Sequence, residues 1–168
     1  MIFECIYSSP VGELRVVTTD TEVLMCDWIA SEKHVEALKR IGGDMATKSY
    51  EGCDFMRRVV TELDEYFNGS RFMFDLSLRL VGTPFQLDVW KALQSLEYGR
   101  TVSYATLANK SGHASSIRAV ASAVAMNPIS VFLPCHRVIR SDGTIGNYRG
   151  GDDAKKFLLE LECKCDIQ

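Results

Sequence analysis

The chain has 168 residues, of which 46% are apolar and 24% charged, and its formal net charge is −3, which fits a globular protein and excludes the disordered and fibrous classes. No apolar run reaches the roughly 18 residues of a membrane span, and the N-terminus has no basic flank followed by an apolar core. We therefore expect no membrane association and a cytoplasmic location, or a nuclear one in a eukaryote, with reduced cysteines.

The charge is unevenly distributed along the chain. Residues 1–82 sum to −5 and residues 83–168 to +2, and the window Tyr98–Arg149 alone sums to +5. A cationic segment in an acidic protein favours an anionic partner such as nucleic acid. A solvated surface with surplus arginines would give the same count.

The first half of the chain alternates between strand-like and helix-like segments. The expected strands are Phe3–Tyr7, Glu13–Thr18 and Glu22–Trp28, and the expected helices are Ser31–Ile41 and Cys53–Phe67. The first of these helices has a serine N-cap and an apolar row at Val35, Leu38 and Ile41. Residues 42–52 are expected to form a flexible loop. These segments predict a small antiparallel sheet covered by helices, with a structural role.

A domain boundary is expected between Leu80 and Thr83, which separates an N-terminal domain (1–80) from a C-terminal one (83–168). Thr83, Pro84 and Gln86 form the pattern of a capped helix start. Further helices are expected at Ser103–Lys110, Ser116–Met126 and Asp153–Lys164. The first two flank Ser111-Gly112 and predict either a helix-turn-helix or a helical hairpin that binds no nucleic acid.

The expected helix Ser116–Met126 has an unusual outer surface. Its core face is predicted to consist of Ile117, Val120, Ala121 and Val124. Arg118 and Ser122 would then lie on the opposite face among small side chains. Such a face suits a nucleic-acid groove, and it suits packing against another helix equally well.

The run Leu133-Pro134-Cys135-His136-Arg137-Val138 sets a thiol, an imidazole and a guanidinium side by side. A nearby positive charge or base lowers the pKa of a thiol and makes it nucleophilic. Cys135 is therefore a candidate nucleophile. A buried structural cysteine is the alternative that this run alone leaves open.

The residues from Gly82 to Glu162 carry a resemblance to a known family. The chain resembles the O6-alkylguanine-DNA alkyltransferases, DNA repair proteins that transfer an alkyl group from damaged guanine to their own cysteine. The matching blocks occur in the family's order: Gly82-Thr83-Pro84-Phe85-Gln86, Val89-Trp90, Gly99-Arg100-Thr101-Val102-Ser103-Tyr104, Arg118-Ala119-Val120, Asn127-Pro128, Pro134-Cys135-His136-Arg137-Val138 and Gly146-Asn147-Tyr148-Arg149-Gly150-Gly151. Ser9-Pro10-Val11-Gly12 with Leu14 is similar to the start of the family's N-terminal domain.

The resemblance implies an α/β protein with a ribonuclease-H-like N-terminal domain and a mostly helical C-terminal domain with a helix-turn-helix. It implies a single-turnover methylated-DNA-protein-cysteine S-methyltransferase that acts on double-stranded DNA containing O6-alkylguanine, with O4-alkylthymine as a further substrate to test. We expect a monomer without cofactor, and leave cooperative binding to DNA open. Some relatives hold zinc, but Cys5, Cys26 and His34 do not reproduce that ligand set, so no metal is expected.

The resemblance also implies roles for individual residues. The implied catalytic residues are Cys135 as the alkyl acceptor, His136 acting through water, Glu162, Asn127 and Tyr104. Helix periodicity alone does not choose between Glu162 and Glu160, whereas the distance from the cysteine motif matches Glu162. The implied DNA-binding residues are Arg118, Ala119, Ser122, Ser103 and Tyr104, with Arg118 replacing the rotated nucleotide, and the implied substrate pocket consists of Val138, Tyr148, Arg149 and Gly150.

Arg149 stands where some relatives have a small residue, so a long side chain at the pocket rim is expected to disfavour bulky alkyl groups. A cysteine hydrolase would need His34 or His113 as base, because neighbours on an extended segment point in opposite directions and His136 could not contact Cys135. A lesion sensor without chemistry would lack Cys135.

Overall fold

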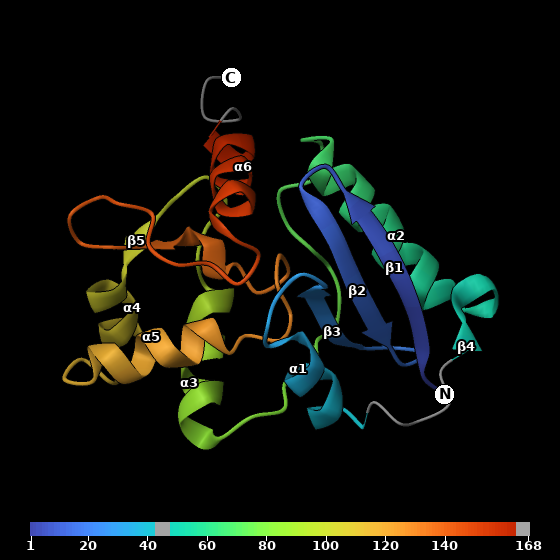
Figure 1. Ribbon diagram of the computed structural model, residues 1–168, viewed down its shortest axis with the longest axis horizontal. Helices are drawn as coiled ribbons and strands as arrows, with labels where there is room; N and C mark the ends of the chain where they lie inside the picture. Colours follow the sequence, from blue (N-terminus) through green and yellow to red (C-terminus); the bar gives the residue numbers. More distant parts are fainter. Residues whose placement is uncertain (43–47, 164–168) are drawn as a thin grey trace.

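The computed structural model describes residues 1–42 and 48–163, which form an α/β structure with a sheet on one side and a group of helices on the other (Figure 1). Strands β1 (Phe3–Ser9), β2 (Gly12–Thr18) and β3 (Val23–Trp28) form an antiparallel meander, which confirms the three expected strands. A short β4 (Lys48–Ser49) pairs in parallel with β1, so the sheet order is β3-β2-β1-β4.

The prediction of a loop at residues 42–52 is wrong for residues 48–52. Residues 48–49 form β4, and Tyr50–Gly52 form a 3₁₀ turn that leads into the next helix. Residues 43–47 lie outside the described part of the chain. The polar composition of the segment hid β4, because a two-residue edge strand is held by backbone pairing to β1 and needs no apolar pattern.

Helix α2 (Asp54–Phe67) matches the expected helix and packs against β1. Cys5 Sγ lies 3.6 Å from Met56 Sδ, and the hydroxyl of Tyr7 donates a hydrogen bond of 2.7 Å to Asp64. These contacts use the alternate residues of β1 that point to one face of the sheet. Ile6, on the opposite face of β1, is 45% exposed.

Helix α1 (His34–Arg40) is shorter than the expected Ser31–Ile41 and buries a different face. After β3 the backbone first forms turns, with Ser31 N–H donating to the Trp28 carbonyl, so the N-cap is Lys33 rather than Ser31. Val35 was expected in the core but is 59% exposed. The face of α1 that packs against β3 instead buries His34 and Ala37.

The free edge of β3 is covered by two segments from elsewhere in the chain. Val23 exchanges backbone hydrogen bonds with Ser77 and Arg79, in the segment that follows α2. Cys26 N–H donates to the Pro128 carbonyl, and Ser130 N–H donates to the Cys26 carbonyl at 2.6 Å. All six residues of β3 are therefore buried, and one apolar core continues from the sheet into the helical half.

The helical half begins with α3 (Pro84–Gln94), whose Thr83–Gln86 capping box is formed as expected. Helices α4 (Tyr104–Lys110) and α5 (Ile117–Ala125) follow, on either side of a turn that contains Gly112 at φ +81°. Helix α6 (Asp152–Cys163) closes the structure, and Lys164, the last residue of the expected helix, lies outside the described residues. No helix within residues 1–42 and 48–163 is long and apolar enough to cross a membrane.

Two short strands next to the cysteine motif were not expected from the sequence. Strand β5 (Val102–Ser103) pairs in parallel with β6 (Val138–Ile139), directly after a 3₁₀ turn at Cys135–Arg137. The pairing fixes the start of α4 beside the cysteine motif. Tyr104, the first residue of α4, is thereby held close to Cys135 although 31 positions separate them in the sequence.

Candidate active site

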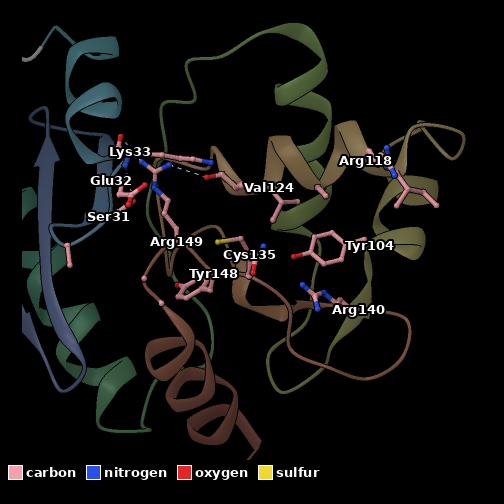
Figure 2. Close-up of a pocket in the computed structure, with 17 residues that line it drawn as sticks. Ser31, Glu32, Lys33, Tyr104, Arg118, Val124, Cys135, Arg140, Tyr148 and Arg149 are labelled. Carbon is pink, nitrogen blue, oxygen red and sulfur yellow. Dashed lines mark hydrogen bonds between the residues drawn. The ribbon is translucent and has the colours of Figure 1, made fainter.

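A cavity of about 750 Å³ lies between α5, the loop before α6 and the turn that follows β3 (Figure 2). Its lining includes Cys135, Tyr104 and Arg118 from the helical half and residues 30–33 from the turn after β3. The two halves of the chain therefore build the cavity together. Cys135 is only 3% exposed, so a substrate must enter this cavity to reach the thiol.

The side chain of Asn127 holds the backbone that leads to Cys135. Its Nδ2 donates to the Leu133 carbonyl at 3.0 Å, and its Oδ1 accepts from the Ile129 N–H at 2.9 Å. Asn127 is fully buried, so both bonds are shielded from water. These bonds fix the turn after α5 and with it the position of the thiol.

The pKa of Cys135 differs from the simplest expectation. Burial raises the pKa of the thiol, and the hydrogen bond from Asn127 and the charges of Lys155 and Arg149 offset this only in part. The expected lowering by the adjacent cation is absent, because Arg137 points to Glu162 instead. The free protein therefore carries a protonated thiol at neutral pH.

Glu162, on α6, accepts five hydrogen bonds behind the cysteine motif, one of them from His136. Its carboxylate accepts from Arg137 Nε and Nη2, both at 2.9 Å, from the Tyr66 hydroxyl at 2.8 Å and from the Gly99 N–H at 3.4 Å. Burial opposes its ionisation, but His136 and Arg137 bring the pKa of Glu162 well below its usual range. Glu160 is exposed, so the structure brings Glu162 and not Glu160 to the site.

His136 is buried next to Glu162, and its ring lies 6.5 Å from the ring of the cavity residue Tyr148. Its Nε2 is 2.7 Å from a Glu162 oxygen, and its Nδ1 is buried with no hydrogen-bond partner among the described residues. Burial lowers the pKa of His136, although Glu162 partly counteracts this, so the ring is neutral and donates its Nε2 proton to Glu162. Nδ1 is then an unprotonated acceptor. The segment is a 3₁₀ turn rather than extended, yet His136 makes no hydrogen bond to Cys135.

Two tyrosines flank the thiol in the cavity. In Figure 2 the hydroxyl of Tyr104 points toward Cys135 from one side, and Tyr148 lies on the other. Burial raises the pKa of both phenols, which therefore remain protonated donors at neutral pH. Tyr148 accepts a 3.2 Å hydrogen bond from Trp28 Nε1, which ties it to β3.

Arg149 occupies a different position from the one expected. Its guanidinium donates to both carboxylate oxygens of Asp27, each at 2.6 Å, and to the carbonyls of Ala125 and Lys33, each at 3.1 Å. The side chain lines the cavity but is buried against Asp27, so it is a fixed wall and not a free arm at the rim. Nothing in the sequence of β3 marked Asp27 as its partner.

The expected faces of α5 are partly wrong. Val120 and Val124 are buried as expected, but Ile117 is 44% exposed and lines the cavity with Ala121. Arg118, Ala119 and Ser122 are exposed, as a surface for DNA requires. Because α5 meets α3 and α4 with Ala123 as well, the core side of the helix is rotated away from Ile117.

Three further expected residues, Ser103, Gly150 and Val138, differ in how close they lie to the cavity. Ser103 is half buried and caps α4 by accepting from the Thr106 N–H at 3.1 Å. Gly150 lines the cavity. Val138 is buried beside it rather than in its lining, and its carbonyl accepts a 2.7 Å hydrogen bond from Lys155 Nζ.

Several site residues were missed from the sequence. Lys155 is fully buried and bonds the carbonyls of Val138 and Asn147, and burial lowers its pKa to about 8. Its place on the apolar side of the expected helix could have identified it, because a lysine is almost never buried unless its ammonium group has hydrogen-bond or charged partners. Tyr66 falls three positions after Leu63 on the core side of α2, but nothing in the sequence linked it to Glu162.

Gly150→Ala is expected to lower the free energy of unfolding by about 1–3 kcal/mol. A Cβ at this position would lie 2.6 Å from Trp28 Cε2, and the indole it displaces holds Tyr148. Urea denaturation of both proteins measures the change. The control is Gly52→Ala, whose added Cβ meets no atom within 4 Å; equal stability of the two variants would contradict the prediction.

The residues that competing chemistries would need lie elsewhere. His113 pairs with Asp88 at 3.0 Å and His34 lies 3.5 Å from Asp27, and neither lines the cavity. Cys5 and Cys26 are buried in the core of the sheet. Among the described residues no group of three His, Cys, Asp or Glu side chains could hold a metal ion.

Comparison with known proteins matches nearly the whole chain to one family. Residues 2–80 match the sequence model of the 6-O-methylguanine DNA methyltransferase ribonuclease-like domain, and residues 84–164 match that of the DNA binding domain of the same family. A methylated-DNA-protein-cysteine methyltransferase of Methanosarcina barkeri is 38% identical over 157 residues, 94% of each chain.

Solved structures agree in fold along the full length. The O6-methylguanine methyltransferase of Mycobacterium tuberculosis superposes with a TM-score of 0.84 at 33% identity, over 98% of this chain and 94% of the other. The same organism's protein in complex with DNA gives a TM-score of 0.83 at 33% identity, over 95% and 91% of the chains. The expected α/β architecture with a ribonuclease-like first half is therefore confirmed.

Proposed function

Because the chain belongs to the 6-O-methylguanine DNA methyltransferase family, we propose that it repairs DNA by moving the alkyl group of O6-alkylguanine onto Cys135. The observation that carries the assignment to this residue is its position. Cys135 is the thiol in the wall of the 750 Å³ cavity, backed by Asn127 on one side and the His136–Glu162 pair on the other. Cys5, Cys26 and Cys53 are buried elsewhere.

The proposed reaction is an in-line displacement at the alkyl carbon. The sulfur of Cys135 forms a bond to that carbon while the bond from the carbon to O6 breaks, and the product is a thioether. The thiol proton passes through water to Nδ1 of His136, and Glu162 stabilises the resulting imidazolium. The departing guanine anion takes up one proton from water, and the His136 imidazolium returns its proton to water, so charge and atoms balance.

Because the pKa of the Cys135 thiol is raised, His136 is needed as a base. A thiol that is protonated at neutral pH needs a base at the moment of transfer, and Nδ1 is a buried acceptor without a partner among the described residues. The Tyr104 hydroxyl, which stays protonated, donates a hydrogen bond to the purine and so stabilises the leaving anion. A thioether is not reduced by ordinary thiols, so each molecule reacts once.

The target nucleotide must leave the duplex to enter this cavity. A thiol that is 3% exposed cannot reach O6 inside stacked DNA, so the nucleotide rotates into the pocket beside Tyr148, Arg149 and Gly150. The exposed α5 face with Arg118, Ala119 and Ser122, together with Ser103, lies against the minor groove. Arg118 takes the place of the rotated nucleotide.

We assign the DNA contacts and the acceptor to residues 83–168 and a supporting role to residues 1–80, within a cytoplasmic monomer. The +5 charge of residues 98–149 supports this division, because phosphates attract it without base specificity. The supporting half is more than a scaffold for the sheet, since Asp27 and Trp28 hold Arg149 and Tyr148 in the pocket. O4-alkylthymine is a second substrate to test.

The test of the function is the stoichiometry of repair. The protein is incubated with a duplex containing one O6-methylguanine, and the bases of the DNA are separated by chromatography. One guanine restored per protein molecule, followed by no further turnover, is the expected result. Restored guanine in excess of protein would show a catalyst that releases its methyl group, and unchanged O6-methylguanine would show that the assigned substrate is wrong.

Arg118→Ala is expected to reduce the transfer rate on duplex DNA about tenfold or more relative to the rate on free O6-alkylguanine. Arg118 is exposed and has no hydrogen-bond or ion-pair partner within residues 1–42 and 48–163, so its removal does not disturb the fold. Arg118→Ala should also reduce the slope of log affinity against log salt concentration by about one, because one fewer counterion is released on DNA binding. Arg100→Ala, another exposed arginine, is the control, and equal effects of both variants would contradict a specific role for Arg118.

A further inference from the structure

The side chain of Ile117 is exposed at the mouth of the cavity, in a place where the sequence pattern predicts core. It is 44% exposed, while Val120 and Val124 of the same helix are buried. It also belongs to the cavity lining, next to the exposed Arg118. Almost half of this apolar residue is therefore left uncovered by the described part of the chain.

The row of α5 that faces the cavity contains one large side chain at its outer end. Ile117, Ala121 and Ala125 are spaced four residues apart and all line the cavity. Figure 2 shows Val124 beside Cys135 and Arg118 at the opposite end of the helix, so α5 leads from the thiol to the mouth. At about 1.5 Å per residue, Ile117 lies roughly 10 Å along the helix from Val124.

We propose that Ile117 is an apolar wedge that enters the base stack where the target nucleotide leaves it, next to Arg118. This inference rests on the proposed function. The first turn of α5 then presents two different groups to DNA, a long cation that reaches phosphates and base edges and a branched hydrocarbon that packs against base faces. Ala121 and Ala125 are too short to reach into the stack, so the helix can lie close to the duplex along the rest of its length.

The chemistry of isoleucine suits this task. Rotating a nucleotide outward exposes the apolar faces of its neighbouring bases to water, and an apolar side chain that covers them recovers part of the lost stacking. Isoleucine has few rotamers on a helix, so little side-chain freedom is lost when it is inserted. Arg118 alone would leave this apolar surface covered only by a hydrated cation.

The test compares duplex DNA with a free base as substrate. Single-turnover rates are measured for wild type, Ile117→Ala and Ile117→Leu on a duplex with O6-methylguanine and on free O6-benzylguanine. We expect Ile117→Ala to lower the ratio of the duplex rate to the free-base rate about tenfold, and Ile117→Leu to stay within about twofold of wild type. The control is Ile6→Ala, which removes the same side chain at 45% exposure from β1, outside the cavity.

Two further readouts separate a wedge from a merely structural role. 2-Aminopurine placed beside the lesion brightens when it unstacks, and this increase should be smaller with Ile117→Ala. A duplex in which the lesion faces an abasic site should restore most of the lost rate, because less stacking has to be broken. The salt dependence of DNA binding should stay at the wild-type value, since no charge is removed.

The outcomes distinguish this inference from the proposed function. If wild type transfers no alkyl group from either substrate, the proposed function fails. If wild type is active and Ile117→Ala has the same rate ratio as Ile6→Ala, the wedge is wrong and the function stands. An equal loss on duplex and free base would also overturn the wedge, because it would place Ile117 in the pocket chemistry.

Discussion

Glu162→Gln lowers the free energy of unfolding by about 3–5 kcal/mol and slows alkyl transfer. The glutamine keeps the shape of the side chain but removes the charge that Arg137 faces with two hydrogen bonds of 2.9 Å. Arg137 is buried, and its remaining hydrogen bond, to the Leu96 carbonyl, brings no negative charge. An uncompensated guanidinium in this position is costly because it cannot return to water without disrupting the fold.

The effect on transfer has a separate cause. The Glu162 carboxylate accepts the Nε2 proton of His136, which leaves Nδ1 free to act as base, and it stabilises the imidazolium that forms. A neutral amide can do the first but not the second. We therefore expect a fall in the rate constant of transfer at saturating DNA with little change in DNA affinity, which rapid-quench kinetics and a binding titration measure separately.

The stability difference depends on pH in a defined direction. The pKa of Glu162 in the folded protein lies well below its unfolded value of roughly 4.3. The stabilisation from its charge is therefore fully present above about pH 4.3 and is lost as the pH falls toward the folded pKa. Urea denaturation of wild type and Glu162→Gln should show the full difference at pH 7, and this difference should begin to shrink only as the pH falls below about 4.3.

Glu160→Gln is the matched control, because Glu160 lies on the same helix but is exposed. Its free energy of unfolding should change by less than about 0.5 kcal/mol. Equal changes in the free energy of unfolding for Glu160→Gln and Glu162→Gln would show that the buried hydrogen bonds of Glu162 do not stabilise the fold.

Arg149→Met is expected to lower the free energy of unfolding by about 3–5 kcal/mol, since it leaves Asp27 fully buried without its charged partner. The loss also frees the carbonyls of Ala125 and Lys33 at two sides of the cavity. The pocket should become wider, so that the rate with O6-benzylguanine rises relative to O6-methylguanine. Denaturation and paired rate measurements check the two effects.

The double variant Asp27→Asn/Arg149→Met shows whether the unpaired charge is the cause. It should be more stable than Arg149→Met alone, because a neutral asparagine tolerates burial better than a carboxylate. Arg140→Met removes another arginine of the same cavity, which is exposed and makes no salt bridge within residues 1–42 and 48–163, and it should be nearly as stable as wild type. If the losses in free energy of unfolding of the two single variants simply added in the double variant, the unpaired Asp27 carboxylate would not be the cause.

The sequence predicts the elements that depend on local chemistry. The capping box at Thr83, the meander of β1 to β3 and the turn at Gly112 each follow from residues close together in the chain, and all are present. The resemblance to a family supplied the roles of the residues around Cys135. The run Cys135-His136-Arg137 alone left open whether this thiol is a nucleophile or a buried structural cysteine.

Long-range pairings account for what the sequence could not show. Asp27 with Arg149, Trp28 with Tyr148 and Tyr66 with Glu162 join residues about 100 positions apart, and no local pattern marks them. The exposure of Ile117 depends on how α5 is rotated against α3 and α4, which its spacing to Val120 and Val124 does not determine. Burial raises the pKa of Cys135. The sequence did not show this burial, and the adjacent Arg137 suggested a lowered pKa instead.

Peptide mass spectrometry identifies the residue that accepts the alkyl group, which we expect to be Cys135. Reduced protein is incubated with a duplex containing O6-methylguanine, and each cysteine peptide is examined for an added methyl group, with Cys135→Ala and the exposed Cys163→Ala as paired variants. We expect one methyl group on Cys135 in wild type and in Cys163→Ala, and none in Cys135→Ala. A methyl group on Cys163, or no adduct from folded wild-type protein, would contradict this expectation.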